Sequence, residues 1–157
     1  MLSRRQVSEL INFIQRKMAV VAHWVGLNKP APLEWEYNGI TILRIYLSPS
    51  GALVHRFHPL TRCSEVAVIR AENYEEMKKA ISSIVRELAE DLVMDLFFRE
   101  YKYNYDLEVR FTLKPDFSWK FFIEENGRTR ILAKGKEGKS PIKAFPVIAK
   151  ICAIQKL

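Results

Sequence analysis

The stretch that decides the fold lies between residues 73 and 99 and reads NYEEMKKAISSIVRELAEDLVMDLFFR. Its apolar residues recur every three or four positions, as on one face of a helix. They are Met77, Ile81, Ile84, Leu88 and Leu92. Asn73 can accept hydrogen bonds from the free N–H groups at a helix start, and the acids that follow suit the positive end of the helix dipole. The pattern predicts one long central helix from about Asn73 to Arg99.

Three carboxylates of this helix, Glu87, Asp91 and Asp95, stand four residues apart and therefore on one helix face. They lie roughly 100°, 60° and 20° from the centre of the apolar stripe, in that order, at about 100° per residue. We expect them to pass from the polar flank into the buried face. Because a buried carboxylate needs a partner, they either pair with Arg or Lys from elsewhere or form a divalent-metal site. A different register would leave them in solvent.

The rest of the chain predicts a helix at each end and hairpins between. Ser3 can cap a helix that continues to about Trp24, and Asn28-Lys29-Pro30 would end it in a short connector. Ser140-Pro141 opens a last helix, whose regular part Pro146 should delay.

Two Asn-Gly pairs, at residues 38–39 and 126–127, are strong hairpin signals. In the first hairpin we expect Trp35 to face Ile42 and Glu36 to face Thr41. The expected strands are Leu33–Tyr37, Ile40–Leu47, Ala52–His58, Glu65–Arg70, Asp106–Leu113, Trp119–Glu125 and Arg128–Ala133. The sequence thus predicts an α+β fold, with a mostly antiparallel sheet of about six to seven strands.

The length of 157 residues fits a single domain, residues 1–157. No apolar run reaches the length of a membrane span, and the N-terminus does not resemble a signal peptide. We expect an intracellular monomer with no membrane partner and no small-molecule cofactor. Cys63 and Cys152 could pair only if the fold brings them together.

The formal net charge of +7 is uneven, because residues 101–157 hold 12 of the 25 Lys and Arg but 6 of the 18 Asp and Glu. A basic region favours a polyanionic partner, with nucleic acid first. Candidate contacts to DNA are Arg86, Arg110, Lys120, Arg128 and Arg130, of which Arg86 adjoins Glu87. The alternative for each is an ordinary solvated surface.

Asp106 and Glu108 form a second candidate metal pair, since alternate strand residues share a face about 7 Å apart. The local pattern is similar to the strand motif of nucleotidyltransferases, but no Gly-Ser pair precedes it. The alternative is an exposed strand balanced by Arg110 or Lys120. His58 is a candidate general base, and its opposite orientation to His55 argues against zinc.

Taken whole, the chain resembles small orphan proteins of the lipothrixvirus group, filamentous viruses of hyperthermophilic archaea. The resemblance rests on the Met1–Val25 helix, the Asn38-Gly39 hairpin and the Ser82–Phe98 helix. It implies an α+β topology remotely similar to nucleotidyltransferases, a nuclease acting on linear double-stranded DNA, and residence in the host cytoplasm.

These observations converge on a divalent-metal-dependent deoxyribonuclease. Glu87, with Asp91 as helper, would hold Mg²⁺ or activate the attacking water, because Mg²⁺ prefers hard oxygen ligands. Asp106 and Glu108 would be the alternative metal pair. The rival hypothesis is a DNA-binding protein of architectural or packaging type, which needs the basic surface and not the acids. A protein–protein adaptor is a third.

Overall fold

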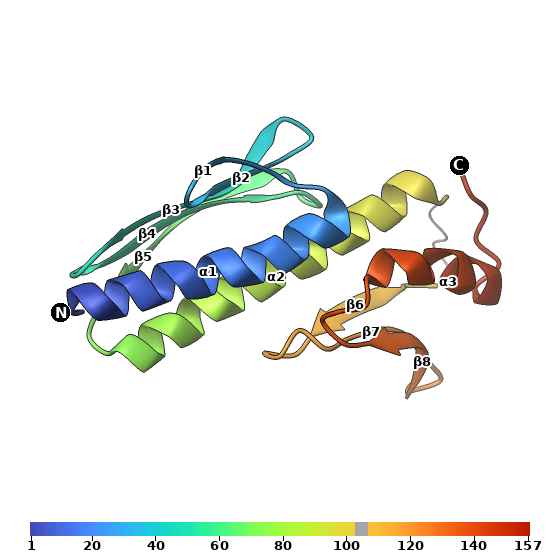
Figure 1. The fold of residues 1–157 in the computed structure, drawn as a ribbon. Helices are drawn as coiled ribbons and strands as arrows, with labels where there is room; N and C mark the ends of the chain where they lie inside the picture. The colour runs from blue at the N-terminus through green and yellow to red at the C-terminus, as the bar shows by residue number, and fades with distance from the viewer. Residues whose placement is uncertain (103–106) are drawn as a thin grey trace.

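The computed structural model describes residues 1–102 and 107–157. Helices α1 (Arg4–Val25) and α2 (Tyr74–Glu100) lie side by side and run in the same direction (Figure 1). A five-stranded sheet packs on one side of this pair, and a three-stranded sheet lies near the second half of α2 with the short helix α3 (Phe145–Ile151). None of the helices in these residues has the length and apolar character needed to cross a lipid bilayer.

Side-chain caps set the starts of the two long helices. Ser3 and Gln6 form a reciprocal capping box at α1, and the Asn73 side chain accepts from the backbone N–H groups of Glu75 and Glu76 at α2. Gly26 ends α1 in the left-handed conformation. The predicted positions of both helices are confirmed.

The five-stranded sheet is an antiparallel meander in chain order. Its strands are β1 (Asn28–Ala31), β2 (Glu34–Tyr37), β3 (Ile40–Ser48), β4 (Gly51–His58) and β5 (Cys63–Arg70). Strand β1 corrects the expected connector: it pairs only with β2, and a proline is tolerated in such an edge strand.

The first predicted hairpin has the expected turn but a shifted register. Asn38 and Gly39 both have positive φ, as the turn requires, and Glu36 faces Thr41. A bulge between Trp35 and Glu36 places Trp35 opposite Leu43 instead of the predicted Ile42.

The second sheet contains β6 (Arg110–Leu113), β7 (Trp119–Glu125) and β8 (Arg128–Gly135), again antiparallel. The α+β class and antiparallel pairing are confirmed, while the strands form two sheets where one was expected. Helix α2, with 27 residues, separates β5 from β6 along the chain. Asp106, the expected start of this strand, lies outside the described residues.

After β8 a 3₁₀ turn, Pro141–Ala144, precedes α3, and Pro146 lies in the first turn of that helix. The regular helix is therefore delayed, as predicted. The free thiols of Cys63, which is exposed, and Cys152, which is buried, are not paired.

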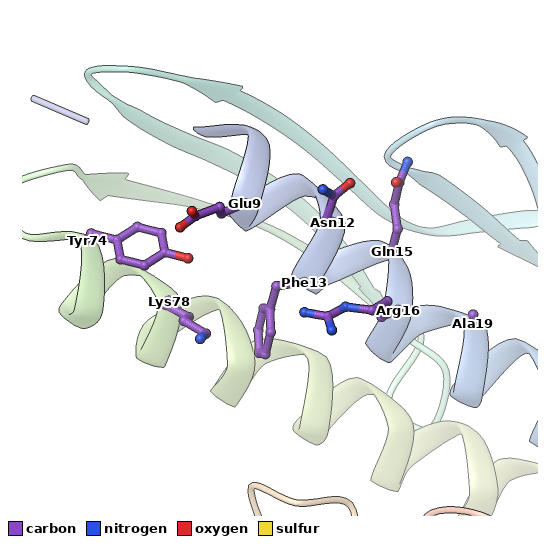
Figure 2. Close-up of a pocket in the computed structure, with 8 residues that line it drawn as sticks. All are labelled: Glu9, Asn12, Phe13, Gln15, Arg16, Ala19, Tyr74 and Lys78. Atoms are coloured by element: carbon purple, nitrogen blue, oxygen red, sulfur yellow. The ribbon is translucent and has the colours of Figure 1, made fainter. Parts of the chain in front are cut away.

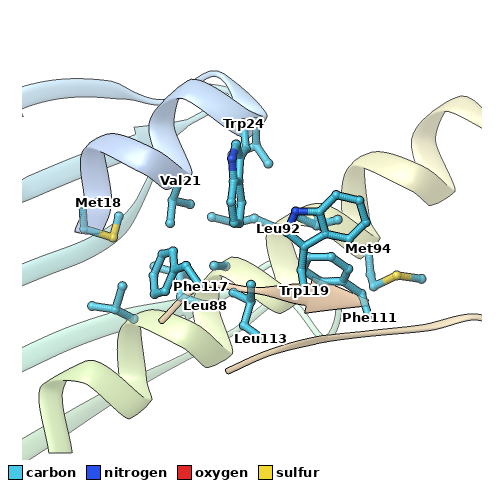
Figure 3. Packing of buried hydrophobic residues seen from close by; sticks show 14 of the residues in the cluster. Met18, Val21, Trp24, Leu88, Leu92, Met94, Phe111, Leu113, Phe117 and Trp119 are labelled. Carbon is cyan, nitrogen blue, oxygen red and sulfur yellow. The ribbon is translucent and has the colours of Figure 1, made fainter. Parts of the chain in front are cut away.

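The hydrophobic core is continuous from the first sheet to the second, and Figure 3 shows the part of it between the two long helices and the second sheet. Trp24 of α1 meets Phe117, with ring centroids 5.9 Å apart, and Leu88 and Leu92 of α2 are fully buried beside them. Phe121 joins the second sheet to α3, because its ring lies 4.7 Å from that of Phe111 and 6.0 Å from that of Phe145. Helix α2 thus packs against both sheets.

Replacement of the fully buried Phe121 by alanine should lower the free energy of unfolding by about 3–5 kcal/mol, through lost transfer energy and the cavity left behind. Urea denaturation followed by circular dichroism measures the change. Phe122→Ala is the matched control, since Phe122 faces outward and should cost much less. Equal losses in the two variants would show that this core is wrongly placed.

Candidate active site

The three carboxylates of α2 become less exposed along the helix, as their predicted angles require. The exposed fraction of the side chain is 60% for Glu87, 29% for Asp91 and 14% for Asp95. The expected passage from the polar flank into the buried face is confirmed.

A buried arginine from the first sheet binds two of them. Arg56 of β4 is 4% exposed; its Nη1 donates to Oε2 of Glu87 at 2.9 Å and its Nη2 to Oδ2 of Asp91 at 2.8 Å. The sequence left open whether these acids pair with a cation from elsewhere or form a metal site. In the structure, Glu87 and Asp91 pair with a cation from elsewhere. We call Arg56, Glu87 and Asp91 the Arg56 cluster.

Sequence reasoning did not single out Arg56, although a signal was available. Strand β4 alternates buried and partly exposed residues, and Arg56 occupies a buried position in series with Ala52 and Val54. A charged residue on the helix-facing side of a strand requires an opposite charge on the helix.

His58 extends the cluster towards β5. Its Nδ1 lies 3.8 Å from Oδ2 of Asp91, and its Nε2 lies 3.2 Å from Oε1 of Glu65. His58 shares the face of Arg56, whereas His55 points to the other face and stacks edge-on against Tyr46, so the two histidines face opposite sides as expected. The imidazole therefore lies between Asp91 of α2 and Glu65 of β5.

Asp95 has a separate role. It accepts from Nε of Arg99 at 2.7 Å, one helical turn further along α2. Burial and the neighbouring Asp95 raise the pKa of the Tyr37 hydroxyl to about 12. The Arg99 guanidinium lies 5.5 Å from the centre of the Tyr37 ring, so the Asp95–Arg99 pair contacts β2 and does not belong to the Arg56 cluster.

A groove between α2 and β6 adjoins the Arg56 cluster. Its walls include Glu90, Asp91, Glu108 and Arg110, over an apolar floor that includes Met94 and Phe111. Glu90 accepts the backbone N–H of Leu113 at 3.2 Å and so attaches the edge of the second sheet to the helix. Asp91 is common to the cluster and to the groove.

Burial dominates the electrostatics of the two helix acids in the groove. It raises the pKa of Asp91 above its ordinary value, although Arg56 and His58 act in the opposite direction. Burial also raises the pKa of Glu90, against the lowering effect of its hydrogen bonds from Leu113 and Thr112. Keeping the carboxylates of Asp91 and Glu90 ionised therefore costs free energy.

The predicted metal ligands are only partly gathered. Glu87 and Asp91 lie together, and Glu108 lines the same groove as Asp91 while its carboxylate lies 3.4 Å from Nη2 of Arg110. Asp106 is outside the described residues. Within residues 1–102 and 107–157, no group of three or more His, Cys, Asp or Glu side chains could hold a metal ion.

The predicted DNA contacts are divided between faces of the second sheet. Lys120 lies opposite Lys134 on the outer face, and Arg110 lies opposite Phe122 on that same face. A bulge between Phe121 and Phe122 reverses the alternation of β8. Arg130 consequently lies opposite the buried Ile123, near Cys152 of α3.

Two further predicted contacts have other surroundings. Arg128 lies opposite Glu125 at the tip of the β7–β8 hairpin. Arg86 is half-buried beside Glu90, and its Nε has no hydrogen-bond partner among the described residues. Neither belongs to the outer-face group of Arg110 and Lys120.

A second hollow, between the first halves of α1 and α2, contains none of the predicted site residues (Figure 2). Glu9, Phe13 and Arg16 of α1 line it together with Tyr74 and Lys78 of α2. Lys78 lies over the Phe13 ring at 4.9 Å, so this contact fastens the two helices.

Comparison of the chain with protein-family models, with curated proteins and with solved structures found no match. The function therefore has to be argued from the geometry of the Arg56 cluster and its groove.

Replacement of Arg56 by methionine should destabilise the protein by about 1–3 kcal/mol, because the partly buried Asp91 loses its cation, whereas the exposed Glu87 loses little. In the triple variant Arg56→Met/Glu87→Gln/Asp91→Asn, most of that loss should be recovered. Chemical denaturation of the two variants and the wild type measures this coupling. An Arg56→Met protein as stable as the wild type would contradict the cluster.

Replacement of Glu90 by glutamine should raise the melting temperature at pH 7. A raised pKa means that the acid stabilises the fold when protonated and that this contribution is lost as the pH rises. The difference from the wild type should therefore vanish below about pH 4.5, the ordinary value for this group. Thermal melts between pH 3.5 and 7 test this. Glu108→Gln, at an exposed groove position, should change little at any pH.

Proposed function

We propose that the protein is a nuclease that hydrolyses double-stranded DNA with Mg²⁺ or another divalent cation, and that Glu87 and Asp91 are its catalytic carboxylates. The proposal rests on the position of Asp91, which both binds the buried Arg56 and lines the groove between α2 and β6. Such an arrangement holds an acid rigidly at the edge of a space open to substrate.

The chemistry required is compatible with these side chains. In phosphodiester hydrolysis a water oxygen forms a bond to phosphorus, the bond to one ester oxygen breaks, and that oxygen takes a proton. Glu87 is the more exposed acid and is suited to accept the proton of the attacking water. The buried Arg56 guanidinium lies beside it, outside the lining of the groove, and holds the carboxylate in place.

The donor set also fits a hard divalent cation. Arg56 takes one oxygen from each carboxylate, Oε2 of Glu87 and Oδ2 of Asp91, and a carboxylate has acceptor sites to spare. Mg²⁺ commonly uses one or two carboxylates and completes its shell with water and substrate phosphate. A protein cage of three ligands is not required for this mode of binding.

The second candidate is a DNA-binding protein without catalysis. It is favoured by the Arg56 cluster itself, since Arg56 gives both acids a cationic partner with no metal ion. The cations on the outer face of the second sheet would serve either function. The resemblance to lipothrixvirus proteins implies a site of action inside the host cell, and we include both in the proposal of a nuclease.

Incubation of labelled linear duplex DNA with purified protein, with Mg²⁺ or with EDTA, tests the proposal. The wild type should degrade DNA only with the metal, and Glu87→Gln should lose about 100-fold or more of the rate. Asp91→Asn should lose activity as well.

Asp95→Asn is the matched control, because Asp95 lies on the same helix stripe but pairs with Arg99 outside the cluster. It should retain most of the activity. Binding of DNA without degradation under every metal tested would refute catalysis and leave the second candidate.

A further inference from the structure

A second groove, on the outer face of the three-stranded sheet, is lined by four lysines. These are Lys114, Lys120, Lys134 and Lys136. Its other lining residues are Thr112, Ser118, Trp119, Ile131 and Gly135, so no acid takes part. We call this site the lysine groove. Its volume is about 550 Å³, enough for a phosphate and its neighbours but not for a whole duplex.

The strand register brings two of the charges face to face. Lys120 of β7 lies directly opposite Lys134 of β8, and like charges in this position destabilise a sheet. Within the described residues, none of the four lysines has a carboxylate within ion-pair distance. An anion between the two strands would remove this repulsion.

The strands that carry the groove are fixed from the core side by the buried indole of Trp119. A Cβ at Gly135 would lie 2.5 Å from a ring carbon of Trp119, so only glycine allows β8 to approach the ring this closely. Nε1 of Trp119 donates to the carbonyl oxygen of Lys139 at 2.8 Å, which holds the loop after β8 in place. The lysines therefore extend from a fixed surface.

The lysine groove adjoins the groove that carries Asp91. Thr112 lines both, and on the outer face Thr112 neighbours Lys120 while Arg110 neighbours Phe122. The Lys120 ammonium lies 5.3 Å from the centre of the Phe122 ring and covers part of it. The lysines are therefore the groups that would contact a ligand. Cationic contacts thus follow the sheet towards the carboxylates.

We infer that the lysine groove binds the phosphate backbone of one strand of duplex DNA and leads that strand across β6 to the groove beside Asp91. The inference rests on the proposed function for the identity of the ligand. Lysines make point contacts to phosphates that carry no sequence information, so binding here should be independent of sequence.

Fluorescence anisotropy with a labelled 16-base-pair duplex in EDTA tests the inference, with Kd measured from 50 to 200 mM salt. Lys134→Gln/Lys136→Gln should weaken binding about tenfold or more at low salt and reduce the salt slope by about 0.9 for each lysine removed. The same variant should melt at the wild-type temperature or higher, because the repulsion between Lys120 and Lys134 is gone. A general loss of structure would lower affinity and melting temperature together.

The matched control is Arg4→Gln/Lys79→Gln, which removes the same charge from exposed sites near the starts of α1 and α2, away from the three-stranded sheet (Figure 1). It should bind nearly as the wild type does. Equal losses in the two variants, or no loss in the lysine-groove variant, would overturn the inference.

The two proposals can fail separately. If the lysine-groove variant loses affinity but the wild type degrades no DNA under any metal, the inference stands and catalysis falls. If the wild type degrades DNA and the variant keeps both its salt slope and its affinity, catalysis stands and the lysine groove is not the DNA site.

Discussion

The guanidinium of Arg56 is removed almost completely from water. The arrangement of α2 against the first sheet depends on giving this buried charge carboxylate partners. A guanidinium at 4% exposure is very unfavourable unless carboxylates replace its hydration. Glu87 and Asp91 do so only when the middle of α2 lies over β4 with the acids turned towards it. A helix rotated about its axis so that these acids face away would bury the guanidinium without a partner, so the ion pairs select the orientation of α2 as well as contributing stability.

The same helix connects this requirement to the second sheet. Glu90 follows the cluster by three residues and accepts from the edge strand β6, while Leu88 and Leu92 pack between the sheets. The groove beside Asp91 therefore has one wall held by Arg56 and another held by a hydrogen bond to Leu113. Burial raises the pKa of both acids, which is the electrostatic cost of placing two carboxylates where the sheets meet the helix.

Much of the fold could be predicted because it depends on local rules. Caps, Asn-Gly turns and the three- and four-residue apolar spacing are short-range, and the increasing burial from Glu87 to Asp95 follows from helix geometry alone. The partner of the acids could not be predicted in the same way, because Arg56 is 31 and 35 residues from them and only the packed fold brings them together. The bulge in β8 could not be predicted from the sequence either. One added residue places Arg130 and Lys134 on opposite faces, although both have even numbers in a strand that reads as regular.

The charge of the Arg56 cluster bears on how a nuclease could work here. One guanidinium and two carboxylates leave a single negative charge, which attracts Mg²⁺ less strongly than two unpaired acids would. A phosphodiester brings the second negative charge, so cluster, cation and phosphate together are neutral. The cation should therefore bind more tightly in the presence of DNA than alone. The lysine groove, by holding the neighbouring phosphates, would raise the local concentration of the phosphodiester that neutralises the site. If the protein is the proposed nuclease, the buried arginine would prevent a strong site for free metal, and the basic sheet would supply the substrate that completes the site.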